Sequence, residues 1–144
     1  MGWIFLSFTV GAACGVILDK HLTNKKHIET AFVALEQAKR HYRIGDQHSG
    51  LKMAWQSITI SPSPTAYYIL GIIEFGFREF EEATRSFWSC TVVFITAKER
   101  GKLNQLGEFA PEFYCHTYFL WALSDALQGN WRNCGRYTTY ALND

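Results

Sequence analysis

The chain has 144 residues, of which 48% are hydrophobic and 16% aromatic, and its 14 basic and 13 acidic side chains give a formal net charge of +1. This balance provides no broad positive field, so we expect no nucleic-acid partner. The length allows one domain of roughly 120 residues beside any anchor. Because the aromatic content exceeds what a small core hides, we expect part of the apolar surface to contact a partner.

The first predicted element is an apolar segment, Trp3 to Leu18, that contains no charged residue. As a helix it would reach about 24 Å, slightly short of a ~30 Å hydrocarbon core but sufficient when flanking side chains extend to the interface. Lys20, Lys25 and Lys26 follow it, and this charge places the remaining chain on the cytosolic, matrix or stromal side. We predict a single-pass anchor over residues 1–22, with a buried soluble helix as the alternative.

Gly11 and Gly15 form a GxxxG pair inside this segment, a spacing that lets another helix approach backbone to backbone. Phe8, Thr9, Gly11 and Gly15 also resemble the FTxGxxxG part of FxxGFTxGxxxG, a pattern of a small family of short single-span mitochondrial proteins, with Ser7 where that family often has glycine. The resemblance covers this short segment alone. It implies a mitochondrial membrane.

Beyond residue 30, two small residues separated by a step of twelve recur in three copies. The pairs are Ala38 and Gly50, Gly71 and Ala83, and Ala122 and Cys134. Small side chains at both positions let two antiparallel helices cross closely. The pattern therefore predicts three helix hairpins.

Each copy has a predicted turn seven residues after its first small residue. The turns fall at Gly45-Asp46, Arg78-Glu79 and Gly129-Asn130. Glycine ends a helix at low conformational cost, and Asp or Asn then caps the next helix. The glycine of the middle copy, Gly76, comes two residues early, so we expect a slightly different turn there.

The middle copy contains Tyr67-x₂-Leu70-Gly71 followed by Ala83-x₃-Phe87. These residues resemble the tetratricopeptide repeat (TPR), whose signature has an aromatic residue, Leu-Gly and Ala-x₃-Phe at the same offsets. The other two copies match in spacing more than in identity. The resemblance implies an all-α fold in which the anchor precedes a short TPR-like superhelix of about three hairpins over residues 23–144. The expected repeats cover about 31–63, 64–97 and 115–144.

Two segments rich in residues that interrupt helices separate the copies. Ser61-Pro62-Ser63-Pro64 is expected to end the first hairpin, because proline cannot continue a helix. The charges, glycines and proline of residues 98–111 predict an insert made of an extended helix end and a loop.

The resemblance also implies a concave groove, lined by the first helix of each hairpin, that receives a peptide or a partner helix. It lacks, apart from one lysine, the Lys, Asn and Arg clamp of chaperone-binding members. The groove positions, mapped by offset and mostly apolar, are Phe32, Leu35, Lys39 and Tyr42, then Tyr68, Ile72 and Phe75, then His116, Phe119 and Leu123.

No pattern in the sequence indicates catalysis or metal binding. The cysteines form no CxxC pair, the histidines show no HxxxH or HExxH spacing, and no nucleophile elbow, P-loop or GxGxxG occurs. We expect no enzyme, no cofactor, no metal site and no small-molecule substrate.

The expected function is a non-catalytic, membrane-anchored TPR scaffold whose partners are other protein subunits and the lipid bilayer. We expect an accessory or assembly subunit of a large membrane complex, in the mitochondrial inner membrane and part of the respiratory chain. The alternative is a mitochondrial outer-membrane receptor, similar in layout to import and fission receptors. A plastid or bacterial assembly factor of the same layout remains a third possibility.

Overall fold

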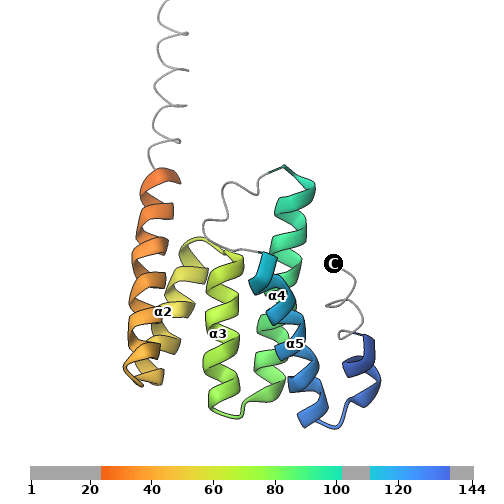
Figure 1. Cartoon of the computed structure of the whole chain (residues 1–144). Helices are drawn as coiled ribbons and strands as arrows, with labels where there is room; N and C mark the ends of the chain where they lie inside the picture. The colour runs from red at the N-terminus through yellow and green to blue at the C-terminus, as the bar shows by residue number, and fades with distance from the viewer. Residues whose placement is uncertain (1–23, 102–110, 137–144) are drawn as a thin grey trace, which may run out of the picture.

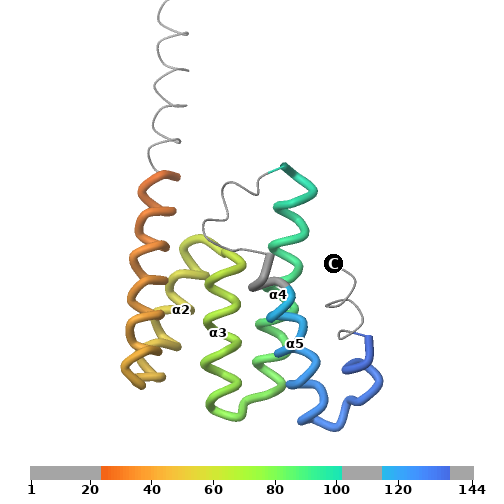
Figure 2. The backbone as a smooth tube through the Cα atoms, in the orientation of Figure 1, coloured from red at the N-terminus to blue at the C-terminus, as the bar shows by residue number. Residues whose placement is uncertain are grey.

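The computed structural model describes residues 24–101 and 111–136, and all regular structure within them is helical, which confirms the all-α class (Figure 1). Successive helices run in opposite directions along the chain (Figure 2). The predicted anchor over residues 1–22, with Gly11 and Gly15, lies outside the described residues. No helix in the described part of the chain is long and apolar enough to cross a membrane. The helices cover residues 24–43, α2 (Gln47–Ile60), α3 (Pro64–Gly76), α4 (Phe80–Glu99), α5 (Pro111–Leu127) and residues 131–136.

The three predicted hairpin turns share one hydrogen-bond pattern. At each, one residue has a positive φ: 81° at Gly45, 64° at Arg78 and 81° at Gly129. Its amide donates to the carbonyl three residues earlier, at 3.0–3.1 Å, and the next amide donates to the carbonyl five residues earlier, at 2.8–3.0 Å. Both bonds satisfy carbonyls that a helix C-terminus otherwise leaves unpaired. The expectation of a different middle turn is therefore wrong, because Arg78 adopts the conformation that glycine supplies in the other two.

The helix starts after these turns differ in their caps. Asp46 caps α2, and its carboxylate accepts a hydrogen bond from the Ser49 amide at 3.2 Å. Glu79, in the same position before α4, makes no side-chain cap bond. The two turns thus agree in backbone geometry although their residues differ.

The serine-proline segment forms the tight connection at the other end of the hairpins. α2 ends at Ile60, and Ser63 caps α3 by accepting a hydrogen bond from the Ala66 amide at 3.2 Å. Pro64 occupies the first helical position, where its missing N–H costs nothing. The predicted end of the first hairpin is confirmed here.

Two buried clusters hold the helices together. The first lies between the helix over residues 24–43, α2 and α3, and the second lies between α3, α4 and α5. Close helix crossings support both: a Cβ on Gly71 would lie 2.6–3.0 Å from three carbons of the Phe87 ring, and a Cβ on Gly50 would lie 3.5 Å from the Ala38 carbonyl oxygen. Ala38 and Ala83 are completely buried. The role expected of small residues at these crossings is confirmed for the first two hairpins.

α4 has 20 residues, whereas its hairpin partner α3 has 13. Its last two turns therefore extend beyond the start of α3, and Arg100 caps the helix. This is the extended helix end that the sequence predicts for the start of the insert. The expected loop falls on residues 102–110, which lie outside the described part.

Candidate interaction surface

A cleft of about 790 Å³ lies between the first helix and the overhanging end of α4. Ile28, Phe32 and Val33 line one wall, and Val92 and Val93 line the other. The serine-proline connection between α2 and α3 also lines the cleft. Both wall helices are longer than their hairpin partners, and the first helix begins at the end of the molecule where α4 ends (Figure 1).

The walls of the cleft are apolar and accessible. Ile28 is 60% exposed, Phe32 59% and Val33 55%. The wall of α4 repeats at helical spacing, with Val93 and Ala97 one turn apart and Arg100 at the mouth. Polar contacts fix the base, since the Ser57 hydroxyl donates to the Ala31 carbonyl at 2.8 Å and ties α2 to the first helix.

Three of the predicted groove residues line this cleft. Phe32 projects from the first helix, Leu35 is buried to 6% exposure within the first core cluster, and Lys39 is half-buried. The Lys39 ammonium pairs with the Glu36 carboxylate at 2.7 Å. A partner in the cleft would therefore meet Phe32 and the apolar stem of Lys39, but little of Leu35.

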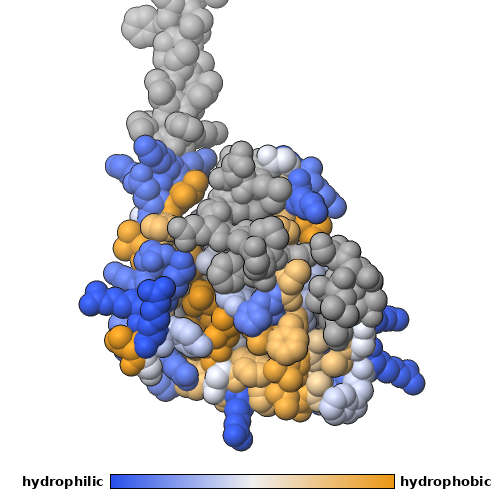
Figure 3. Space-filling view, in the orientation of Figure 1, coloured by the Kyte–Doolittle hydropathy of each residue, from blue (hydrophilic) through white to orange (hydrophobic). Residues whose placement is uncertain are grey.

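A second group of predicted residues comes together between α3 and α5. The Tyr68 hydroxyl and the Nδ1 atom of His116 lie 2.5 Å apart, and the His116 ring stacks on Phe119 with ring centroids 6.4 Å apart and an interplanar angle of 12°. His116 and Phe119 are exposed, the latter to 55%. On the face seen in Figure 3, apolar side chains gather over α3 and α5.

Tyr68 itself is a core residue. It is 6% exposed and belongs to the second buried cluster. Desolvation, with smaller contributions from Cys90 and Tyr42, raises the pKa of Tyr68 to about 12, so its hydroxyl stays protonated and can donate to His116. Tyr68 therefore holds the His116 ring from the core, and His116 and Phe119 are more accessible than Tyr68.

The remaining predicted positions line the same side less openly. Tyr42 is 38% exposed, and Ile72, Phe75 and Leu123 are half-buried. Ile72 and Phe75 pack against the second core cluster. The candidate surface therefore has two accessible parts, the cleft at one end and the exposed ring pair on α5. Tyr42 adds a second exposed aromatic side chain on the first helix, beside Phe32.

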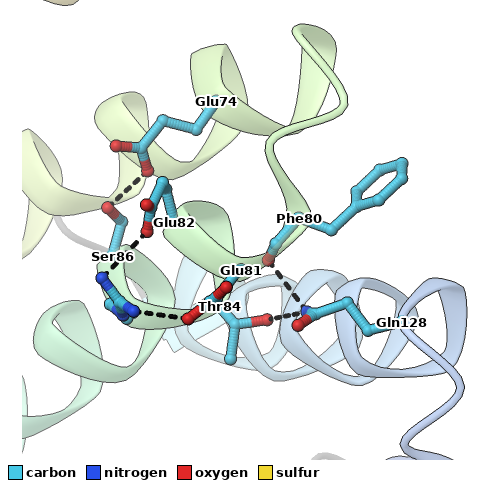
Figure 4. A network of polar contacts seen from close by, with 8 residues as sticks. Glu74, Phe80, Glu81, Glu82, Thr84, Ser86 and Gln128 are labelled. Atoms are coloured by element: carbon cyan, nitrogen blue, oxygen red, sulfur yellow. Dashed lines mark hydrogen bonds and ion pairs between the residues drawn. The ribbon is translucent and has the colours of Figure 1, made fainter.

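A buried carboxylate, Glu74, was not singled out by the sequence pattern. It is 4% exposed, and its Oε2 atom accepts a hydrogen bond from the Ser86 hydroxyl at 2.6 Å (Figure 4). Burial, opposed by the Ser86 hydrogen bond and assisted by the nearby Glu82 and Glu79, raises the pKa of Glu74 to about 7. In the sequence Ser86 looks like any surface serine, so nothing there indicated the Glu74–Ser86 pair.

Polar contacts also join α5 to the start of α4. The Gln128 side-chain amide donates to the Phe80 carbonyl and to the Thr84 hydroxyl, each at 3.0 Å (Figure 4). Nearby, Arg85 pairs with Glu81 and Glu82 on the exposed side of α4. Because those ion pairs are exposed, they add little stability. The Gln128 bonds supplement the second core cluster, which packs α4 against α5.

The described residues hold no group of three or more histidine, cysteine or carboxylate side chains placed to bind a metal. Cys90 and Cys115 are free thiols, and burial raises the pKa of Cys90 to about 12, which keeps it protonated.

No family model matches the chain, and no curated protein or solved structure shows significant similarity to it.

Proposed function

We propose that this chain is a non-catalytic scaffold of the TPR type, anchored in a membrane, that serves as an accessory or assembly subunit of a large membrane complex. The proposed location is the respiratory chain of the mitochondrial inner membrane. The observation that carries the proposal is the recurrence of one hairpin geometry, with accessible aromatic side chains on the first helix of the first and third hairpins. A stack of similar hairpins suits protein binding because it holds such side chains on a rigid face.

The exposed groups on this face support a protein partner. Phe32, Tyr42 and Phe119 are large apolar side chains with exposed fractions between 38% and 59%. Aromatic residues are enriched in protein interfaces, where burying them contributes most of the binding energy. The anchor rests on the sequence, through the uncharged segment from Trp3 to Leu18 and the lysines that follow it.

The test is blue-native electrophoresis of gently solubilised membranes, with mass spectrometry of the band that contains the chain. Co-migration with a large complex at fixed stoichiometry is expected, and the mass spectra would name the complex. Migration as a small free species would contradict the subunit proposal.

Variants connect this test to the surface. Phe119→Ala should release a measurable fraction of the chain from the complex, because it removes the exposed ring beside His116. Trp55→Ala is the matched control, since Trp55 is 49% exposed on α2, the second helix of its hairpin. Equal release by both variants would show that the face formed by the first helices is not the docking face.

The accessible cleft favours the receptor as a second candidate, because a permanent subunit would be expected to keep such walls covered. In that case the full chain in detergent should bind short amphipathic presequence peptides reversibly. Fluorescence anisotropy of labelled peptides measures this directly, and no saturable binding would remove the receptor proposal.

A further inference from the structure

The end of the molecule that contains the cleft is also basic. Lys25 and Lys26 lie one turn before the cleft wall on the first helix, and Lys98 and Arg100 close the end of α4. All four are exposed. Among the described residues beside these four, Glu29 and Glu99 are acidic, and Glu29 lines the cleft, so basic side chains outnumber acidic ones. Hydrophilic residues accordingly appear at both helix ends in Figure 3.

The size and lining of the cleft suit a slender apolar ligand. Its volume of about 790 Å³ lies within the range of sites that enclose small molecules. The apolar path between Phe32 and Val93 offers room for a lipid acyl chain.

The proposed anchor would hold this end near a bilayer. Six residues separate Leu18, the last residue of the uncharged segment, from Lys25. Anionic headgroups attract a positive surface that is tethered near the bilayer in this way. Each nearby Lys or Arg strengthens membrane binding about fivefold. An apolar cleft and a cationic mouth thus occur at the same end of the domain.

We propose that this cleft binds one acyl chain of an anionic phospholipid, whose phosphate lies at Arg100 and Lys98. The inference rests on the membrane anchor of the proposed function. The site would fix the tilt of the helical domain on the bilayer and so determine which face is presented to protein partners.

The test uses the full chain in liposomes that contain phosphatidylglycerol with a photoreactive diazirine near the end of one acyl chain. Phosphatidylcholine carrying the same chain is the comparison lipid. After illumination and trypsin digestion, we expect label on peptides 27–39 and 86–98, placed within the second at Val93 and Ala97. Label spread equally over Trp88 and Ile95, exposed residues of α4 outside the cleft lining, would overturn the proposal because it indicates surface contact.

Two variants separate the headgroup from the chain site. Arg100→Gln should lower cleft labelling by phosphatidylglycerol about fivefold and leave labelling by phosphatidylcholine unchanged. Arg132→Gln, an exposed arginine outside the cleft lining, is the matched control and should change neither. Ala97→Phe narrows the cleft and should abolish the label at Val93. Unchanged labelling in both cleft variants would overturn the proposal.

Flotation of the same liposomes distinguishes the two proposals. If the chain fails to float with neutral liposomes, the membrane anchor itself is wrong. If it floats but both lipids label the cleft equally, the anchor stands and the anionic site is wrong. If the cleft is labelled only after partner subunits are removed from the native complex, a protein segment occupies it and the lipid proposal is again overturned.

Discussion

The first and second hairpins share the same turn and the same spacing, yet they place glycine on opposite helices. In the second hairpin Gly71 lies on the first helix, and the Phe87 ring of α4 packs directly on it. In the first hairpin the glycine is Gly50 on the second helix, and its nearest neighbour is the Cδ1 atom of Ile73, from the next hairpin, 3.2 Å from where a Cβ would lie. Ala54 occupies the position that corresponds to Phe87.

This difference shows that a repeated spacing specifies the crossing of two helices but not what fills the space around it. The second hairpin uses its glycine to bury a large ring at the centre of the α3, α4 and α5 cluster. The first uses its glycine to admit a side chain from its neighbour. We therefore expect the second hairpin to be the more sensitive to substitution, and the predictions below test that contrast.

Replacing Phe87 with alanine should have the largest effect. The ring is completely buried and packs in the second core cluster, so Phe87→Ala should lower the free energy of unfolding by about 3–5 kcal/mol. Phe119→Ala, at an exposed ring, should cost less than about 1 kcal/mol. Urea unfolding of the full chain in a mild detergent, followed by circular dichroism, measures both. Similar costs for the two would contradict the packing of the second hairpin.

Glu74 should make the second hairpin sensitive to pH. Its folded pKa of about 7 exceeds its ordinary value of 4.5, so the folded state binds more protons between those pH values. The contribution of this group is therefore full below about pH 4.5, falls as pH rises to 7 and is constant above it. The difference is about 3 kcal/mol at 1.36 kcal/mol per pH unit.

Glu74→Gln removes this titration while leaving an oxygen that can accept from Ser86. The variant should exceed the original chain in stability at pH 8 and lose most of that advantage at pH 5. Urea midpoints at the two pH values give the result. Glu81→Gln, on the exposed side of α4, is the control and should not alter the slope. An unchanged pH slope in Glu74→Gln would show that Glu74 is not buried as described.

Alanine at the two glycines compares the hairpins most directly. Gly71→Ala forces the buried Phe87 ring to move and should cost about 1–3 kcal/mol. Gly50→Ala meets the flexible end of Ile73 and gains up to about 1 kcal/mol of helix propensity, so it should be close to neutral. Thermal unfolding of the two variants side by side tests the contrast. Equal costs would mean that the two crossings are equally tight.

Much of this fold could be predicted because its signals are local. Gly45, Gly129 and the serine-proline segment fix chain reversals through backbone preferences of their own residues. The surface was less predictable. Offset mapping identified the helix face that carries Tyr68, but this side chain is buried in a cluster with residues of α4 and α5 that lie far away in the chain. The α4 wall of the cleft likewise depends on where the extended helix end lies relative to the first helix, which no local pattern specifies.

Glu74 and Arg78 show the same limit of prediction from local sequence, because their environments are energetically unusual for their residue types. A carboxylate near a helix end is usually solvated, and the sequence gives no sign that Ser86 will face this one. Arginine rarely adopts a positive φ, so the presence of Arg78 argued against the turn geometry found there. The packing of α3 against α4 imposes that geometry. In both cases contacts made after the hairpin closes override the preference of the residue.

The turns provide the smallest and most symmetrical test. Arg78 occupies a left-handed conformation that costs an L-residue about 1–2 kcal/mol. Glycine avoids this cost but loses more chain entropy on folding, which offsets part of the gain. Arg78→Gly should therefore stabilise the protein by about 0.5–1 kcal/mol. Gly45→Arg, the reverse exchange in the equivalent turn, should destabilise it by a similar amount. Nothing lies within 4 Å of a Cβ added at Gly45, so this variant measures backbone strain without a clash. Opposite shifts of similar size in the urea midpoint would show that the two turns are energetically equivalent. Shifts of the same sign would show that side-chain contacts of Arg78 outweigh its strain, and that the second hairpin closes for reasons the first does not share.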